Sequence, residues 1–347
     1  AQCLVGSEMC IRDRERIDHI FVVQIELLMV KIDLITGFLG AGKTTFLKKY
    51  AQYLMEQGEN IGILENDFGA VNVDMMLLQD LMGDNCELEM VAGGCDYDCH
   101  KRRFKTKLIS MGMCGYDRVL VEPSGIYDVD EFFDVLHEEP LDRWYQINNV
   151  IAIVDSKLEQ TMTKQAEYLL ASQIAQAGSI FFSKVDDSTQ EEREGTIHYL
   201  NHVLEQFQCS RRLQNEIIQK DWSQMEDGDF EQIRSCGYTL DHTSKLWFDE
   251  NEAFTSLYFM NVHMPEDKLR ETAKALLQDT SCGKVFRVKG FMQMEDGTWI
   301  ELNATKSNIR ITPVPQGQDV IIVIGEQLAQ DAIESYWKDY LPPSDLN

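Results

Sequence analysis

Positive charge is scarce in this chain. It has 32 lysines and arginines against 58 aspartates and glutamates in 347 residues, which gives a formal net charge of −26. A nucleic-acid backbone or an anionic lipid surface would repel such a chain, so the charge argues against nucleic acid and membrane as main partners. The surplus of carboxylates is compatible with the handling of cations, although acidity alone usually serves solubility.

Long apolar runs are also missing. The segment Ile20–Val30 is too short to span a bilayer and carries Gln24 and Glu26. It has no small-residue cleavage site, so it does not match a secretory signal. We expect Met29 to be the native start and residues 1–28 to be a non-native or disordered leader.

The nine cysteines lack the regular spacing of a secreted disulfide scaffold, and their number is odd. This pattern predicts reduced thiols and a cytoplasmic protein. The apolar and charged fractions, 44% and 26%, are those of a globular chain. The length allows two domains, each with its own core.

A glycine-rich loop lies between an apolar strand and an amphipathic helix. The segment Gly37–Thr44 reads GFLGAGKT, a full match to the phosphate-binding pattern G-x-x-x-x-G-K-[ST]. The strand is Ile32–Ile35, and Gly58 ends the helix. The apolar face of the helix is formed by Leu47, Tyr50, Ala51 and Leu54. In this pattern backbone N–H groups surround a phosphate chain, Lys43 reaches the β- and γ-phosphates, and the Thr44 hydroxyl ligates Mg²⁺.

A candidate base-recognition motif follows a later strand. Ile180–Phe182 is apolar, and the next four residues are Ser183-Lys-Val-Asp186. This resembles N-K-x-D with serine in place of asparagine. The Asp186 carboxylate would accept hydrogen bonds from the ring N–H and amino group of guanine, and the Lys184 stem would cover the base. The motif therefore favours guanine, although an ATP-dependent kinase or ligase stays open as an alternative.

An acidic residue follows each of two further strands. Glu122 follows Val119–Val121 and precedes Gly125. Asp155 follows Val150–Val154. The carboxyl ends of the strands line the ligand crevice of a doubly wound sheet. Glu122 is therefore placed to hold Mg²⁺ through water, whereas Asp155 either reaches the site or caps the next helix.

Another strand ends in Glu65, Asn66 and Asp67, with Gly69 beyond. Carboxylates at this position are typical of a switch segment near a Mg²⁺–phosphate site. The alternation of strands and helices predicts an α/β fold of the P-loop NTPase type, with a doubly wound, mostly parallel sheet.

Taken in order, GFLGAGKTT, ENDFG, GGC, EPSG and SKVD resemble the CobW-type P-loop metallochaperone GTPases, relatives of the nickel-insertion GTPases of urease and hydrogenase maturation. The resemblance covers the chain from Met29 onward. It implies a GTPase domain over residues 29–248 and a smaller C-terminal α+β domain over residues 249–347. Gly283–Met292 looks like the strand of that second domain that carries R-x-K-G.

The second domain should contain five strands and two helices. The strands are expected at Ser256–Asn261, Lys284–Gln293, Thr298–Asn303, Asn308–Pro313 and Asp319–Gly325. The helices are expected at Pro265–Leu277 and Glu326–Tyr340. The polar, turn-rich segment Met225–Ser244 would lead into this domain, with the linker near its end.

The resemblance also implies a function. The expected activity is slow GTP hydrolysis, coupled to binding or delivery of a transition metal such as zinc or cobalt, or to metallocofactor maturation. No arginine stands out as an arginine finger, which fits slow turnover. The expected partners are guanine nucleotide, a transition metal and a client metalloenzyme, with a second copy in a homodimer as a further option. An alternative is a nucleotide-gated module that docks on a client metalloenzyme and holds no metal itself.

Several residues take roles from the resemblance together with the motif chemistry. Lys43 and Glu122 are the expected catalytic residues. Mg²⁺ would be held by Thr44, Asp67 and Glu122. The nucleotide would be bound by Gly40, Ala41, Gly42, Lys43, Thr44, Thr45, Ser183, Lys184 and Asp186.

The family's metal motif, G-C-x-C-C, is altered here. Cys95 matches its first cysteine, the next two positions are Tyr97 and Asp98, and a cysteine returns only at Cys99. If the segment is helical, the two cysteines share a face and two thiolates could share one zinc ion. The resemblance makes Glu65 the third candidate ligand, and the adjacent His100 is a fourth. The cysteines could instead simply pack in the core or act as a redox pair.

A rival histidine pair, His198 and His202, lies at helical spacing. The apolar face of that helix is formed by Ile197, Leu200, Val203, Leu204 and Phe207. Both histidines lie opposite this face, so a solvated surface is favoured over a metal site.

Overall fold

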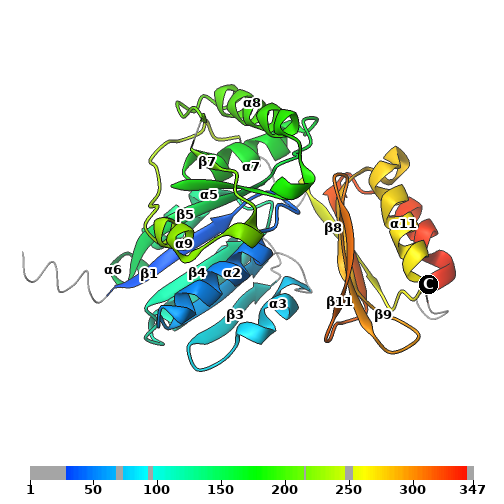
Figure 1. The fold of residues 1–347 in the computed structure, drawn as a ribbon, viewed down its shortest axis with the longest axis horizontal. Helices are drawn as coiled ribbons and strands as arrows, with labels where there is room; N and C mark the ends of the chain where they lie inside the picture. The colour runs from blue at the N-terminus through cyan, green and yellow to red at the C-terminus, as the bar shows by residue number, and fades with distance from the viewer. Residues whose placement is uncertain (1–28, 68–72, 93–96, 215, 247–252, 342–347) are drawn as a thin grey trace, which may run out of the picture.

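The computed structural model describes residues 29–67, 73–92, 97–214, 216–246 and 253–341 (Figure 1). It contains a seven-stranded parallel sheet and, later in the chain, a five-stranded antiparallel sheet. Both parts of the predicted fold are therefore confirmed. Within the described ranges, no helix has the length and apolar character needed to cross a membrane.

The parallel sheet has the strand order of a doubly wound fold, and the first strand lies at its centre. In spatial order its strands are β3 (Cys86–Ala92), β2 (Ile61–Asp67), β4 (Arg118–Pro123), β1 (Val30–Thr36), β5 (Tyr145–Asp155), β6 (Ser179–Ser183) and β7 (Ile217–Ile218). Because the order changes direction on either side of β1, the loop after β1 opens at a switch point of the sheet, where ligands bind in such folds.

Helices cover both faces of this sheet. One face carries α2 (Lys43–Glu56), α3 (Val73–Leu78) and α9 (Asp227–Arg234). The other carries α4 (Tyr97–Gly112), α5 (Val129–Leu136), α6 (Leu141–Trp144), α7 (Lys164–Ala175) and α8 (Gln190–Gln206). Short 3-10 turns lie at η1 (Gln79–Leu81), η2 (Val185–Asp187), η3 (Trp222–Gln224), η4 (Thr280–Cys282) and η5 (Lys338–Tyr340).

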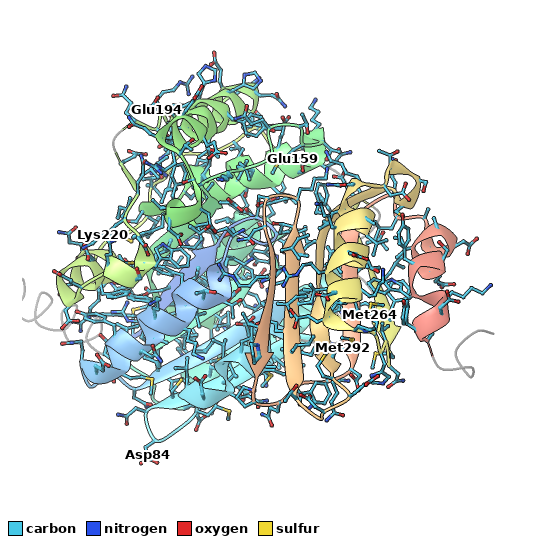
Figure 2. All side chains as sticks on the ribbon, turned by 45° about the vertical axis from the view of Figure 1, so that its right-hand side comes forward. Asp84, Glu159, Glu194, Lys220, Met264 and Met292 are labelled. Carbon is cyan, nitrogen blue, oxygen red and sulfur yellow. The ribbon has the colours of Figure 1, made fainter. Side chains whose placement is uncertain are left out.

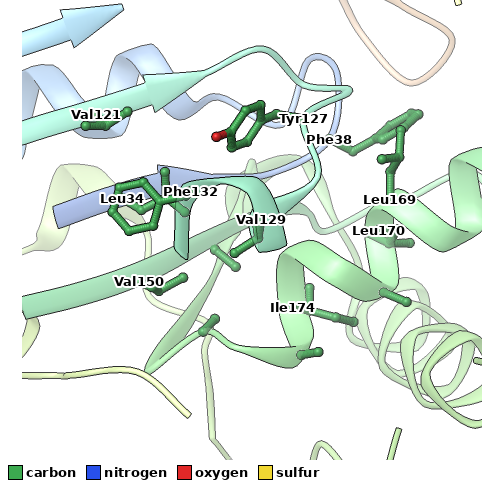
Figure 3. Packing of buried hydrophobic residues seen from close by; sticks show 14 of the residues in the cluster. Leu34, Phe38, Val121, Tyr127, Val129, Phe132, Val150, Leu169, Leu170 and Ile174 are labelled. Atoms are coloured by element: carbon green, nitrogen blue, oxygen red, sulfur yellow. The ribbon is translucent and has the colours of Figure 1, made fainter. Parts of the chain in front are cut away.

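Side chains alternate between the two faces of each strand, so they fill the two cores on either side of the parallel sheet. Leu34 of β1 packs into the core drawn in Figure 3, together with Phe132 of α5 and Ile174 of α7. The next residue, Ile35, points to the opposite face and packs under α2 with Leu47. The apolar helix face predicted from the sequence is buried throughout. Burial of each such aliphatic side chain contributes about 1.5–3 kcal/mol, so these contacts fix α2 on the sheet.

The second sheet has the order β11-β10-β9-β12-β8. Its strands are β8 (Thr255–Met260), β9 (Lys284–Gln293), β10 (Trp299–Thr305), β11 (Ile309–Val314) and β12 (Val320–Glu326). Two helices, α11 (Glu266–Gln278) and α12 (Gln330–Trp337), cover one face. The last helix begins four residues later than predicted, because Glu326 still belongs to β12.

The other face of the antiparallel sheet packs against the first unit. Phe291, Ile322 and Ile324 form a small core with Leu39 of the glycine-rich loop and Leu77 of α3. Figure 1 shows this sheet between the first unit and α11, and Figure 2 shows side chains filling the space around it. The phosphate-binding loop is therefore in direct contact with the second sheet.

The predicted boundary between the two units concerns residues that the structure does not describe. The predicted boundary at residues 248 and 249 lies within residues 247–252, outside the described residues, as does the predicted leader 1–28. The last described helix of the first unit is α9 and the first described strand of the second is β8. The division at residue 248 therefore stays a prediction.

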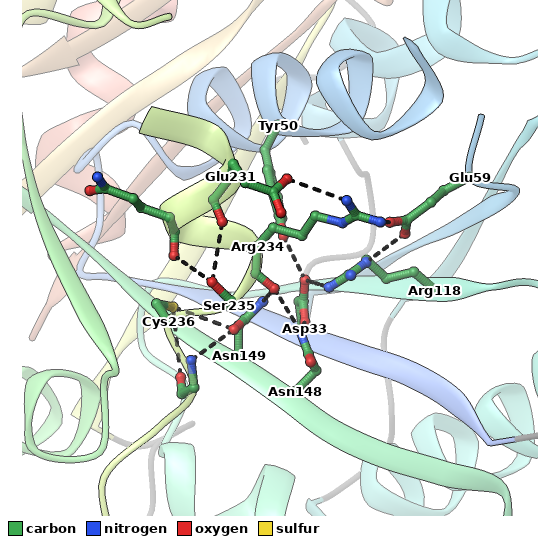
Figure 4. A network of polar contacts seen from close by, with 12 residues as sticks. Asp33, Tyr50, Glu59, Arg118, Asn148, Asn149, Glu231, Arg234, Ser235 and Cys236 are labelled. Atoms are coloured by element: carbon green, nitrogen blue, oxygen red, sulfur yellow. Dashed lines mark hydrogen bonds and ion pairs between the residues drawn. The ribbon is translucent and has the colours of Figure 1, made fainter. Parts of the chain in front are cut away.

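A polar network is buried beneath α2. Arg118 of β4 and Asp33 of β1 form an ion pair with 2.6 Å between Nη1 and Oδ2, and both side chains are fully buried (Figure 4). The Tyr50 hydroxyl of α2 donates to the same aspartate at 3.0 Å. Arg118 Nε also lies 2.8 Å from a carboxylate oxygen of Glu59. The network joins two neighbouring strands to the helix that follows the glycine-rich loop.

Candidate nucleotide and metal site

The glycine-rich loop leads directly into the amino end of α2. Gly42 caps the helix at φ 98°, a left-handed conformation that glycine adopts at little cost. Lys43 is buried, and its Nζ donates to the carbonyl of Gly37 at 3.1 Å, which closes the loop on itself. The loop borders a cavity of about 250 Å³. Because the first N–H groups of a helix attract anions, this cavity suits phosphate.

A hydroxyl and a carboxylate meet in the wall of this cavity. Thr44 Oγ1 donates to Glu122 Oε1 at 2.8 Å, and Glu122 is buried near the end of β4. Glu65 of β2 lies in register beside Glu122 and is also buried. Hard oxygen donors of this kind fit Mg²⁺. The side chain of Asp67, the third predicted Mg²⁺ ligand, lies outside the described residues.

Lys184 links the candidate guanine motif to the phosphate loop. Its backbone is left-handed, with φ 55°, and its Nζ donates to the Gly40 carbonyl at 3.1 Å. The same ammonium lies 2.6 Å from Asp155 Oδ2. Helix α7 is capped by Thr163, so Asp155 anchors this lysine and does not cap that helix. Of the two interpretations of Asp155 left open by the sequence, the structure therefore favours the one that places it at the site.

The other two residues of the guanine motif differ in exposure. Ser183 is buried at the end of β6, with its Oγ 3.4 Å from the carbonyl of Val154. Asp186 lies exposed in η2. The carboxylate that would read the base is therefore accessible, whereas the serine that replaces the asparagine lies in the interior.

A tryptophan beside the site has no counterpart in the sequence predictions. A side-chain carbon added at Gly42 would meet Trp222 at 3.4 Å and Ser183 at 3.6 Å. The indole Nε1 donates to the carbonyl of Phe182 at 3.1 Å, and the ring packs edge-on against Phe46. Trp222 therefore fills the corner between the phosphate loop and the base motif. No motif in the sequence around it marks this position.

The cavity also has a wall from the second sheet. Besides the loop, α2 and Glu122, it is lined by Leu77, Arg287, Glu301, Asn303, Arg310 and Thr312. The sequence predictions contained no basic residue of the second domain at the nucleotide site. The available signal was the R-x-K-G strand, but the docking of one unit on the other is a long-range property that the strand pattern does not encode.

The proposed transition-metal ligands are only partly described. Cys95 lies outside the described residues. Helix α4 begins at Tyr97, which places the half-buried Cys99 in its first turn. No group of three or more His, Cys, Asp or Glu side chains that could hold a metal occurs among the described residues. The shared site of the two cysteines therefore stays a prediction.

Two of the proposed metal ligands lie on opposite faces of the sheet. His100 is buried, and its Nε2 lies 2.7 Å from Oδ1 of Asn66. Glu65 precedes Asn66 on β2, so its side chain points to the face that carries Glu122 and Thr44. The structure thus places Glu65 beside Glu122 on one face of the sheet and does not bring it together with His100.

The rival histidine pair lies on the surface, as predicted. His198 and His202 of α8 are both exposed, while Leu200 and Val203 of the same helix are buried. The helix therefore presents its apolar face to the core and its histidines to solvent.

The fold and the cavity define a P-loop nucleotide-binding protein. A parallel doubly wound sheet places a closed glycine-rich loop, the pair of Thr44 and Glu122 and the pair of Lys184 and Asp155 around one opening. The family model described as the CobW/HypB/UreG nucleotide-binding domain matches residues 31–211, more than half of the chain. The model described as the cobalamin synthesis protein cobW C-terminal domain matches residues 254–341. The chain belongs to the CobW/HypB/UreG family.

Curated relatives include two proteins of Escherichia coli K12. "Zinc chaperone YjiA" is 31% identical over 176 residues, which are 47% of this chain and 52% of that protein. "Zinc chaperone YeiR" is 29% identical over 167 residues, 48% of this chain and 50% of that protein. The chain thus spans about half the length of the curated relatives it matches. The solved structure of Zn(II)-bound YjiA GTPase from E. coli is 19% identical, with a TM-score of 0.36, and the match covers 90% of this chain and 99% of that one.

Proposed function

We propose that this protein is a GTPase that couples its nucleotide state to the binding or delivery of a transition metal, zinc or cobalt, or to metallocofactor maturation. The observation that carries the proposal is the meeting of three separate motifs at one opening. Lys184 of the base motif contacts the Gly40 carbonyl of the phosphate loop, and Thr44 of that loop contacts Glu122. Family membership and the names of the zinc chaperone relatives support the same function.

The proposed chemistry is mainly positioning. Lys43 would neutralise charge on the phosphate chain, and the N–H groups at the start of α2 would hold the phosphates. Thr44 and Glu122 would hold Mg²⁺, with Asp67 as a further ligand. When bound, Mg²⁺ would neutralise negative charge on the phosphate oxygens. Lys184 and Asp186 would hold the base, so the chain's own groups fix both ends of the nucleotide.

The proposed place of action is the cytosol. Six cysteines in the described part of the chain are free thiols: Cys86, Cys99, Cys114, Cys209, Cys236 and Cys282. Burial raises the pKa of the Cys86 thiol to about 11, and burial likewise raises the pKa of Cys236 to about 11. These two thiols therefore stay protonated at neutral pH. The free cysteines in the described part of the chain fit a reducing compartment.

Asp186→Asn tests the guanine assignment. The variant loses a carboxylate that accepts two hydrogen bonds from guanine, so GTP affinity should fall about 10–100-fold. Xanthine carries a carbonyl oxygen where guanine has its amino group, and the asparagine amide can donate to it. Affinity for XTP should therefore rise. Competition against a fluorescent nucleotide measures both changes.

Glu191→Gln serves as the matched control, because it removes an exposed carboxylate a few residues further along the chain. Its GTP, ATP and XTP affinities should equal those of the wild type. If Asp186→Asn leaves the ratio of GTP to ATP affinity unchanged and gains no affinity for XTP, the guanine assignment is wrong.

Cys95→Ser/Cys99→Ser tests the coupling to metal. Thiolates are strong ligands of zinc and hydroxyls are weak ones, so the double variant should lose one bound Zn²⁺ per chain. In the wild type the affinity of this ion should differ between the complexes with GDP and with a non-hydrolysable GTP analogue. Metal titration with a chromogenic chelator, in both nucleotide states, measures the stoichiometry and the affinity.

Cys114→Ser is the control, since this exposed thiol lies just beyond α4. It should bind the same amount of metal as the wild type. Equal zinc and cobalt stoichiometry for the wild type and the double variant in both nucleotide states would reject a metal site at these cysteines. That result would favour a nucleotide-gated module that docks on a client metalloenzyme.

A further inference from the structure

The phosphate cavity collects positive charge in an acidic chain. Its lining includes the cations Lys43, Lys48, Arg287 and Arg310 against the carboxylates Glu122 and Glu301. The whole chain has the opposite balance, with a formal net charge of −26. Cations from two separate units thus converge on one cavity, which suits a ligand with several negative charges.

The two arginines are neighbours on one face of the antiparallel sheet. Arg287 of β9 pairs with Thr305 of β10, and Asn303 of β10 pairs with Arg310 of β11. Arg287 Nε donates to Asn303 Oδ1 at 3.2 Å, so the asparagine orients this guanidinium. Because residues two apart on a strand share a face, both arginines point toward the phosphate loop.

The side chain of Arg287 lies close to the glycine-rich loop. A side-chain carbon added at Gly40 would lie 4.0 Å from Cδ of Arg287 and 2.5 Å from Cγ2 of Thr305. Phe38 of the same loop packs edge-on against Phe286, the residue before Arg287. The glycine therefore allows the second sheet to approach the loop closely, and the sheet contacts the loop at successive residues.

The turn between β10 and β11 attaches the sheet to the base motif. Ser307 Oγ donates to Asp155 Oδ2 at 3.1 Å, the same oxygen that contacts Lys184. Asn308 Nδ2 donates to Asp187 Oδ2 at 3.3 Å. Lys306 Nζ also lies 2.9 Å from Glu159, which is labelled in Figure 2. Since Arg310 follows this turn by two residues, the attachment fixes its strand beside the cavity.

We propose that Arg287 and Arg310 are catalytic residues supplied by the second sheet, which contact the terminal phosphate of the nucleotide bound to the same chain and neutralise the charge that develops there. This inference rests on the proposed GTPase function. It assigns a role to the R-x-K-G strand and removes the need for an arginine from a partner protein.

The reaction served is hydrolysis of the bond between the β- and γ-phosphates. The water oxygen forms a bond to the γ-phosphorus, and the bond from that phosphorus to the bridging oxygen breaks. The bonding electron pair stays on the bridging oxygen as part of GDP, and the water proton passes to phosphate or solvent. Negative charge grows on the bridging oxygen and shifts over the γ-phosphate, where a guanidinium fork stabilises it.

The test compares Arg287→Gln and Arg310→Gln with the wild type under single-turnover conditions. Glutamine keeps much of the side-chain length and its hydrogen-bonding capacity while it removes the charge. We expect hydrolysis to fall about 100-fold in each variant, with GDP affinity unchanged. Binding of aluminium fluoride to the GDP complex should be lost, because this ion mimics the γ-phosphate in the transition state. Arg287→Lys, which restores charge without the fork, should recover part of the rate.

Arg270→Ala is the control, because this exposed arginine lies on α11, over the opposite face of the same sheet. It should hydrolyse GTP like the wild type. Unchanged hydrolysis and aluminium fluoride binding in the glutamine variants would overturn the inference. If GDP affinity and the rate of GTP hydrolysis fell together, the inference would be overturned as well, because the two arginines would then serve only to hold the second sheet on the first unit. Failure of the wild type itself to bind or hydrolyse GTP would instead reject the proposed function.

Discussion

Lys43→Ala is expected to abolish GTP hydrolysis. Lys43 is the first residue of α2, is buried at the cavity and closes the glycine-rich loop through the Gly37 carbonyl. The variant would lose the ammonium that faces the phosphate chain and the contact that holds the loop. Loss of one preorganised donor costs about 10²–10³ in rate, and here the loop contact is lost as well. Phosphate release should therefore fall below detection.

Lys49→Ala is the matched control for this change. Lys49 lies on the same helix, is partly exposed and is not part of the cavity lining. Its variant should retain wild-type turnover. Phosphate release and the far-ultraviolet circular dichroism of both variants, measured side by side, separate lost chemistry from lost structure. Retained turnover in a folded Lys43→Ala protein would refute the assignment of the phosphate loop.

The fold was largely predictable because its signals are local. The apolar strand before Gly37, the helix face that contains Leu47, and the strand that ends in Glu122 each depend on side chains a few residues apart. The same holds for the second sheet, where β9 has the predicted bounds Lys284–Gln293. The other elements of the second domain begin within one residue of the prediction. The last helix begins four residues late, because Glu326 pairs with Lys284 of β9 and this extends the strand β12.

The nucleotide site was predictable to the extent that it is built from contiguous motifs. The pair formed by Thr44 and Glu122 follows from a loop motif and a strand end that share one sheet edge. The contact from Lys184 to Asp155 depends on two neighbouring strands, which explains why the role of Asp155 stayed open in the sequence. Each such contact joins elements that the doubly wound order places side by side.

The residues that sequence reasoning missed come from long-range docking. Arg287 and Arg310 reach the cavity only because the whole antiparallel sheet rests on the first unit. Trp222 reaches Gly42 from a short 3-10 turn after the last strand of the parallel sheet. No hydrophobic periodicity and no motif in the sequence indicates that the two arginines or Trp222 lie at the cavity. The sequence motifs alone therefore single out no arginine at this cavity.

The candidate metal ligands show a second limit. Glu65 was grouped with the cysteines on the family resemblance, and His100 because it follows Cys99 in the sequence. A strand, however, sends consecutive side chains to opposite faces. Asn66, on the face turned to α4, is the residue that contacts His100. A sequence motif names candidate ligands, but the alternation of side chains along the strand determines which of them can contact one another.

Arg118→Met should cause a large loss of stability. The arginine and Asp33 are both fully buried, 2.6 Å apart, and Tyr50 donates to the same aspartate. Methionine keeps much of the side-chain volume but leaves a buried carboxylate without its counter-ion. Removal of one partner from a buried ion pair costs about 3–5 kcal/mol, so the free energy of unfolding in urea should fall by that amount at pH 7.

Arg143→Met is the matched control. Arg143 also pairs with a glutamate, Glu139, but the two side chains are 71% and 73% exposed. Solvent screens such a pair, so the free energy of unfolding should change by no more than about 1 kcal/mol. The same substitution at two ion pairs thus isolates the effect of burial. Equal small losses for Arg118→Met and Arg143→Met would contradict the expected role of the buried network.

The pH dependence of unfolding gives a second readout of the network. Burial acts to raise the pKa of Glu59, but the hydrogen bonds and charges of Arg118 and Arg234 together outweigh it and lower the pKa below its ordinary value of 4.5. A carboxyl group with a lowered folded pKa stabilises the fold above its ordinary pKa, and this contribution is lost as the pH falls through the folded value. Arg118→Met lacks one of the two arginines that lower the pKa of Glu59, and Arg234 remains. The difference in free energy of unfolding between the wild type and this variant should therefore become smaller below about pH 4.5. If that difference stayed constant down to about pH 3, the pairing of Glu59 with Arg118 would be excluded as a source of the stability difference.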